Sequence, residues 1–186
     1  MSVLAAVRAA TRERHEELET NAGILDRLAD PAGRPALLAA FLSLYAPAEA
    51  TLEPLLAPIP DYDFEGRRKT PALRRDLQVL GAGAPPLPAA PPPVFSGRAE
   101  ALGFAYVLEG STLGGRVIRK RLRAAGRSLD GTSFFDVYGP ATGARWTSFC
   151  AILERECADR AAEAVAGALA GFAWVRAGLA AEPAAA

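Results

Sequence analysis

Apolar positions recur along most of this chain with the three-to-four-residue spacing of an α-helix, and no convincing alternation typical of a β-strand is present. Proline and glycine mark where the helical pattern should change. Pro47 and Pro54 fall inside the second predicted helix, so we expect a kink or a break there, and Gly126 should end the long helix. The pattern predicts helices over about residues 3–20, 35–56, 67–80, 98–125, 143–157 and 159–179.

These helices fit one compact all-α domain, a helical bundle that covers residues 1–186. A chain of 186 residues, of which 51% are hydrophobic, is long enough for one sizeable core and short for two. Residues 81–96 are rich in proline and should form a surface loop, because neither flank is long enough to favour an interdomain linker. We expect a loop or short turn over residues 130–139 and a frayed tail over residues 181–186.

Lys and Arg number 21 and Asp and Glu number 21, so the formal net charge is zero. This balance argues against a nucleic-acid binder or a membrane-surface protein, both of which usually carry a basic excess. We find no secretory signal, and no uncharged run outside the proline-rich segment is long enough to span a bilayer. Cys150 and Cys157 are two helical turns apart, beyond the reach of a disulfide. They are predicted to be reduced core residues of a cytoplasmic protein.

The chain has one histidine, which excludes any metal site that needs several imidazoles. On a helical wheel, His15 lies between a mainly apolar stripe and a stripe that holds Arg8, Arg12 and Glu19. Such a helix suits a largely apolar ligand with an anionic edge. Glu19 lies one turn from His15, where it could fix one ring nitrogen and leave the other for a metal. An ordinary surface pair of the two side chains remains the alternative.

Glycines interrupt the long predicted helix at positions where a helix is destabilised by them. Gly103, Gly110 and Gly114 share one face, and Gly115 follows directly. A strip without side chains lets a flat ligand approach the backbone, and the paired glycines supply a flexible point. Close packing of another helix is the alternative. The stretch lacks the Lys-Ser/Thr of a phosphate loop and the spacing of a nucleophile elbow, so we reject both.

Two segments together resemble the signatures of the haem oxygenase family. They are ATRERHEELE near the N-terminus and YVLEGSTLGG in the long helix. The second is most similar to bacterial members, particularly those associated with bacteriophytochromes. The order of predicted helices extends the resemblance over nearly the whole chain. It implies a bundle in which haem, both substrate and cofactor, is held between the N-terminal helix and the glycine-containing helix.

The resemblance also implies roles for individual residues. His15 matches the proximal iron ligand, and Glu19 matches the carboxylate that orients it. The basic positions that face the haem propionates match Arg8 and Arg12. The distal glycines, which let the backbone approach haem and oxygen, match Gly110, Gly114 and Gly115.

Other positions are less closely matched. Animal-type members have Asp where this chain and the bacterial motif have Ser111, so distal water would be held by backbone, Ser111 or Thr112. Tyr106 is a candidate pocket or propionate contact, with an ordinary core role as the alternative. The family places basic propionate contacts on a late helix, and Arg145 lies in such a helix without a residue-by-residue match.

The implied reaction converts haem to biliverdin, carbon monoxide and ferrous iron, using O2 and electrons from a separate donor such as a ferredoxin or a flavin reductase. We expect the biliverdin to supply a bacteriophytochrome apoprotein. A haem storage or delivery protein that does not degrade haem is the first alternative, and a helical enzyme or interaction protein without haem is the second. A basic run after Gly115 fits donor docking, a propionate contact or a solvated helix face; it comprises Arg116, Arg119, Lys120, Arg121, Arg123 and Arg127.

Overall fold

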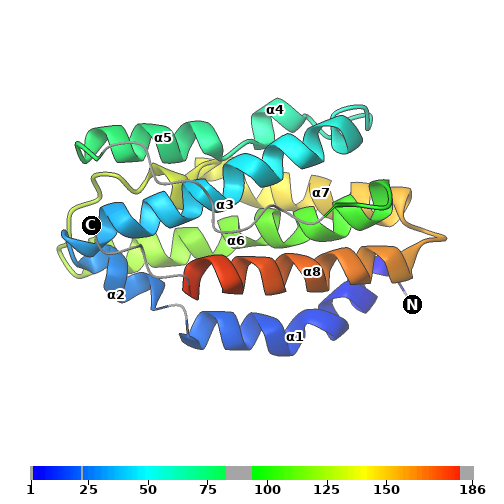
Figure 1. The fold of residues 1–186 in the computed structure, drawn as a ribbon, viewed down its shortest axis with the longest axis horizontal. Coiled ribbons are helices and arrows are strands. Elements are labelled where there is room, and N and C mark those ends of the chain that lie inside the picture. The colour runs from blue at the N-terminus through cyan, green and yellow to red at the C-terminus, as the bar shows by residue number, and fades with distance from the viewer. Residues whose placement is uncertain (1, 22, 83–93, 181–186) are drawn as a thin grey trace.

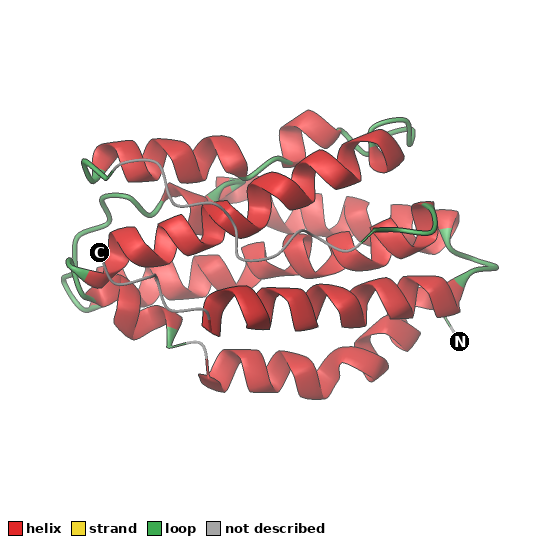
Figure 2. Cartoon of the chain, in the orientation of Figure 1, coloured by secondary structure: helices red, strands yellow, loops and turns green. Residues whose placement is uncertain are grey.

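The computed structural model describes residues 2–21, 23–82 and 94–180, and the described chain is a bundle of helices laid along one long axis (Figure 1). Figure 2 shows helices joined by loops, without a strand in the described ranges, which confirms the all-α prediction. Most of the predicted proline-rich loop and the whole predicted tail lie outside the described residues. The helices are α1 (Val3–Asn21), α2 (Ile24–Ala29), α3 (Gly33–Leu56), α4 (Phe64–Arg67), α5 (Thr70–Val79), α6 (Arg98–Ala124), α7 (Thr142–Glu156) and α8 (Ala161–Ala180), with 3-10 turns η1 (Ser133–Asp136) and η2 (Gly139–Ala141).

All six predicted helices are present with ends shifted by a few residues, while the short helices α2 and α4 were not predicted. Of the kink or break expected in the second helix, the break is wrong, because α3 continues through Pro47 and Pro54. Both ends of α3 are buried in the same core, and this burial outweighs the hydrogen bonds that the prolines remove. The long helix ends as predicted, since Gly126 follows its last turn with a φ of 66°.

Helices α6 and α8 run in the same direction and pack with their backbones in close approach (Figure 1). A Cβ added at Gly103 would lie 1.9 Å from the Ala164 carbonyl oxygen, and one added at Gly167 would lie 1.9 Å from that of Glu100. Only glycine fits at these positions without moving a helix. Close helix packing, which the sequence left as an alternative, therefore explains Gly103.

Helix α1 lies beside α8 and runs in the same direction as both α8 and α6 (Figure 1). Its predicted apolar stripe is confirmed by Val7 and Thr11, which are buried. The start of α1 is fixed to α7, because the Glu154 carboxylate accepts hydrogen bonds from the backbone amides of Val3 and Leu4, both at 2.9 Å. These amides have no partner within α1, so the carboxylate caps the helix.

The described residues bear on two predictions, that no segment spans a membrane and that the two cysteines are reduced. Helix α3 is long and apolar enough to cross a membrane, which the search for uncharged runs missed. Half of its most apolar window is buried inside the bundle, and a core helix passes the same test, so this property is weak support for a membrane span. Cys150 and Cys157 are free thiols, as predicted, and burial raises the pKa of Cys157 to about 11.

Candidate functional site

The N-terminal side of the candidate site is the exposed part of α1. His15 is exposed, and its ring meets the edge of Phe172 on α8 with 6.0 Å between ring centroids. Arg8 and Arg12 are also exposed, so their guanidinium groups remain accessible to an anionic ligand. The side chain of Glu19 lies outside the described part of the structure, and its proposed contact with His15 stays a prediction.

Tyr106 connects α6 to α1. Its side chain lies near Arg8 and Thr11 of α1. Burial raises the pKa of Tyr106, while the positive charge of Arg8 opposes this rise. The two helices run in the same direction, and Thr11 lies about one turn before His15 while Tyr106 lies about one turn before Gly110. His15 and Gly110 thus each follow, by about one turn, the place where Tyr106 lies near α1.

The next two turns of α6 carry an open apolar face formed by Gly110, Leu113, Gly114 and Val117. A Cβ at Gly114 would have no neighbouring side chain or distant backbone within 4 Å, and one at Gly110 would approach only Trp146, at 3.7 Å. Leu113 is 39% exposed and Val117, one helical turn further on, is 51% exposed, so two large apolar side chains adjoin on the surface. This face is therefore open. Packing does not require glycine at Gly110 or Gly114, because a larger side chain would fit at both positions.

Gly115 has a different environment from the open glycines. A Cβ at this position would lie 2.6 Å from the carbonyl oxygen of Phe135 in η1. The four glycines that the sequence grouped together therefore divide into two kinds. Gly103 and Gly115 allow close contact with other parts of the protein, whereas Gly110 and Gly114 face outward from it.

The hydroxyl groups that follow Gly110 are engaged with the protein. Ser111 Oγ donates to the Leu108 carbonyl at 2.8 Å and lies 2.9 Å from the Tyr45 hydroxyl, which is therefore the donor in that contact. Burial keeps the pKa of Tyr45 well above its usual range, so this hydroxyl holds its proton. Thr112 is buried and donates to the Glu109 carbonyl at 2.7 Å. Of the two candidates for holding water, Ser111 is the one at the surface.

An aromatic group from α7 completes the side of the site near Gly110. The Trp146 ring lies 5.5 Å from the Tyr106 ring and 5.8 Å from the Phe149 ring, centroid to centroid. It is the side chain nearest to Gly110. Sequence reasoning missed Trp146 because nothing in its own helix links it to the glycines. Tyr45 was missed for the same reason.

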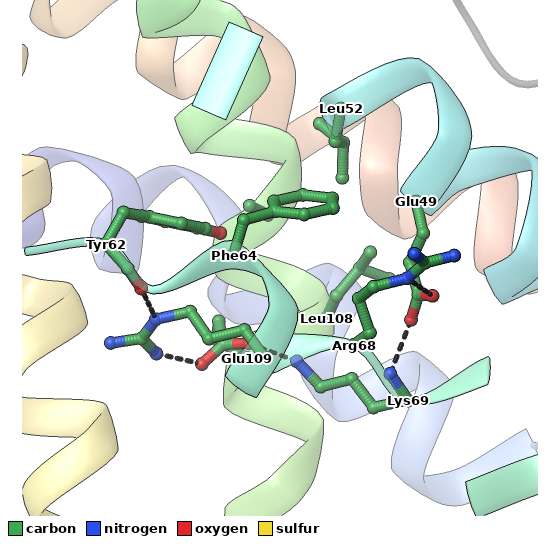
Figure 3. A pocket seen from close by; sticks show the side chains of 10 residues that line it. Glu49, Leu52, Tyr62, Phe64, Arg68, Lys69, Leu108 and Glu109 are labelled. Atoms are coloured by element: carbon green, nitrogen blue, oxygen red, sulfur yellow. Dashed lines mark hydrogen bonds and ion pairs between the residues drawn. The ribbon is translucent and has the colours of Figure 1, made fainter. Parts of the chain in front are cut away.

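To one side of the open face lies a buried cluster of charged residues at a small cavity, shown in Figure 3. Its centre is Glu109, whose carboxylate pairs with Arg67 at 2.5 Å and with Lys69. Glu49 accepts a hydrogen bond from the Lys69 backbone amide at 2.5 Å, and Arg68 lies at the edge of the cluster. Sequence reasoning missed this cluster, although a single charged residue between Leu108 and Gly110 was an available signal.

The basic residues are not all available to a partner. Arg116 and Arg119 both pair with Asp136, at 3.3 and 2.9 Å. Arg145 pairs with Asp63 at 2.6 Å, which lowers the pKa of Asp63 through that hydrogen bond. The rest of the basic run is exposed and consists of Lys120, Arg121, Arg123 and Arg127.

The described residues fit a flat ligand that carries a metal and acidic groups. The imidazole of His15 on α1 could supply one nitrogen to a metal whose other four nitrogens come from a porphyrin. Gly110 and Gly114 on α6 leave a stretch of helix surface without side chains. Arg8 and Arg12 supply positive charge for acidic groups. This combination defines the class, an all-α protein with a site suited to haem.

Comparisons with known proteins agree with this class. The haem oxygenase family model matches residues 1–178. A curated heme oxygenase from Xanthomonas campestris pv. campestris (strain 8004) is 40% identical over 141 residues, which cover 75% of this chain and 84% of that protein. The crystal structure of heme oxygenase 2 from Chlamydomonas reinhardtii without heme has the same fold, with a TM-score of 0.72, 17% identity and full coverage of both chains. The chain belongs to the haem oxygenase family, and it is an oxidoreductase that degrades haem.

Proposed function

We propose that this enzyme converts haem to biliverdin, carbon monoxide and ferrous iron, using O2 and electrons from a separate protein. One observation carries the assignment of the site. Tyr106 of α6 lies near Arg8 and Thr11 of α1, and His15 and the open glycine face that starts at Gly110 each begin about one turn further along their helices. When haem is bound, it supplies the iron at which O2 is activated.

In this proposal each residue has a limited task. His15 gives one ring nitrogen to the iron, and Glu19 orients the ring from the next turn of α1. Arg8 and Arg12 bind the propionates, and Tyr106 holds Arg8 in position. Burial raises the pKa of Tyr106 more than the nearby Arg8 lowers it, so the phenol keeps its proton and can donate to a carboxylate.

On the opposite side, the backbone of α6 controls what can approach the ligand. Gly110 and Gly114 allow contact with the backbone itself, while Gly115 sets how α6 rests on η1. Ser111 keeps an acceptor lone pair for distal water, since its own proton is donated to Leu108. Thr112 is a less suitable water site because its hydroxyl is buried.

The electron donor we propose is an acidic protein such as a ferredoxin, with a flavin reductase as the other candidate. The exposed part of the basic run supports this, because unpaired surface charge steers association with an acidic partner. Raising the salt concentration should therefore slow reduction by an acidic ferredoxin more than reduction by ascorbate.

We further propose that the biliverdin supplies a bacteriophytochrome in the cytoplasm. Support comes from the segment YVLEGSTLGG, which is most similar to family members associated with these photoreceptors. Co-expression with a bacteriophytochrome apoprotein in a host without bilins tests this. A red-absorbing holoprotein is expected, and a colourless apoprotein in cells that accumulate free biliverdin would contradict the supply.

The decisive test of the reaction mixes the purified protein with haemin and adds a reductant in air. A Soret band should form, then decay as a bilin spectrum grows and carbon monoxide appears. A Soret band that persists during turnover would contradict degradation and leave a haem-binding protein. The variant His15→Ala should change the ferric and ferrous spectra, whereas the matched control Arg14→Ala, also exposed on α1, should not.

A further inference from the structure

Glu109 directly precedes the open glycine face, yet its side chain is only 3% exposed. Both carboxylate oxygens are engaged. Oε2 accepts a hydrogen bond from Arg67 at 2.5 Å, and Oε1 accepts from Lys69 Nζ and from the Tyr138 hydroxyl, the latter at 2.8 Å. Burial and the neighbouring Glu109 charge raise the pKa of Tyr138, so its hydroxyl keeps its proton and donates.

The groups that hold Glu109 are themselves fixed to other segments. Arg67 donates from Nε to the Tyr62 carbonyl at 2.6 Å and from its guanidinium to the Arg145 carbonyl at 3.3 Å. Lys69 is fixed through its backbone amide to Glu49 of α3. Through one carboxylate, α6 is therefore joined to α4, to the start of α5 and to the segment before α7.

Stability alone does not account for this cluster. Two buried carboxylates, Glu49 and Glu109, face two buried cations, Arg67 and Lys69, so the charges balance. The desolvation of such groups cancels most of their attraction, and apolar side chains of equal volume often stabilise a protein as well or better. Apolar side chains would not hold α6 in one orientation. The hydrogen bonds do, because each of them is directional and fixes a Glu109 oxygen against a particular donor.

The cluster meets α6 from one flank of the open face. On a helix, Glu109 points about 100° to one side of Gly110, and Ser111 points about 100° to the other side. Glu109 is held by the charged cluster, and Ser111 is held by Tyr45 from α3. The contacts of Glu109 and Ser111 fix the rotation of α6 about its own axis. This rotation decides the direction in which Gly110 and Gly114 face.

We infer that Glu109 is a positioning residue that, through Arg67, Lys69 and Tyr138, fixes the rotation of α6 and so turns the glycine face toward the haem side. This inference rests on the proposed function, because only that proposal identifies the side of α6 on which haem binds. Glu109 does not touch the ligand. Its effect is on how α6 is held before haem binds, so it can be measured in the haem-free protein.

Hydrogen exchange of the haem-free protein is the direct test. In Glu109→Gln, amides of residues 107–116 should exchange at least about tenfold faster, because the charged contacts that oppose local opening are weakened. Amides of residues 98–104, where Gly103 meets α8, should keep their rates. Trp146 gives a second readout in a Trp174→Phe background, since its ring lies beside Gly110 and its emission should change.

Two further variants separate positioning from general stability. Arg34→Gln removes another buried charge, one that holds the Leu28 and Asp130 carbonyls, and should leave the relative rates within α6 unchanged. Glu109→Gln combined with Lys69→Met restores the charge balance and should regain melting temperature without regaining slow exchange at residues 107–116. If the double variant regains both, or if Glu109→Gln speeds exchange uniformly or nowhere, the positioning role is overturned.

Haemin titrations of the same proteins separate this inference from the proposed function. Wild-type protein that gives no Soret band would overturn the haem site itself. Wild-type protein that binds haemin normally, together with unchanged exchange in Glu109→Gln, would overturn the role of Glu109 alone. We expect normal binding in the wild type and at least about tenfold weaker haemin affinity in Glu109→Gln.

Discussion

Alanine substitutions at the glycines of α6 should have opposite effects on the two kinds of position. At Gly114 an added Cβ meets no neighbour within 4 Å, and at Gly110 it meets only Trp146, at the ordinary contact distance of 3.7 Å. Within a helix, glycine is about 0.5–1 kcal/mol less favourable than alanine. Gly114→Ala should therefore stabilise the haem-free protein by about that amount, which raises its melting temperature by about 1–4 °C.

The same substitution should impair the site. A methyl group on the open face lies where the ligand must approach the backbone, and overpacking of this kind costs about 1–3 kcal/mol. We expect haemin affinity or turnover to fall about tenfold in Gly114→Ala and Gly110→Ala. The control is Gly103→Ala, whose Cβ would lie 1.9 Å from the Ala164 carbonyl oxygen and should lower the melting temperature.

Circular dichroism melts of the haem-free proteins and Soret titrations measure the two effects separately. A haem-free Gly114→Ala protein that melts below the wild type would show that this glycine serves the fold. A variant with raised stability and unchanged haemin binding and turnover would show that the open face is not the ligand face. Either result would refute the division of the glycines.

Other consequences of the structure can be tested with single changes. The contacts that Glu154 makes with the start of α1 lower its pKa, so its stabilising effect is present above the ordinary value of 4.5 and is lost as the pH falls below it. Glu154→Gln should therefore reduce the loss of melting temperature between pH 6 and pH 3.5, and an unchanged pH profile would contradict the cap. Tyr106→Phe should weaken haemin binding by releasing Arg8, with a stability loss of only about 1 kcal/mol in denaturant titrations. Burial raises the pKa of both thiols, and Cys157 is the more buried, so mass spectrometry after alkylation at pH 8 should find Cys150 modified first.

Several features of the fold could be predicted from local sequence alone. The three-to-four-residue spacing predicted the long helices, and Gly126 predicted the end of α6. Both features depend only on residues within one or two helical turns. The effect of Pro47 and Pro54 could not be predicted in this way. Whether a proline breaks a helix depends on how much of that helix is buried elsewhere, and α3 is buried along its length.

Some features of the site also follow from local sequence, and others depend on how distant segments pack. Three features of the site can be read directly from the order of residues: His15 is the only imidazole, arginines lie beside it on its helix, and glycines share a face of the long helix. Tertiary structure alone decided which glycines are open, because this depends on whether Ala164 or Phe135 lies against them. It also decided that Glu109 is buried among partners from three other segments. Helical periodicity fixes the direction of a side chain on its own helix, whereas its neighbours are fixed only when distant segments pack together.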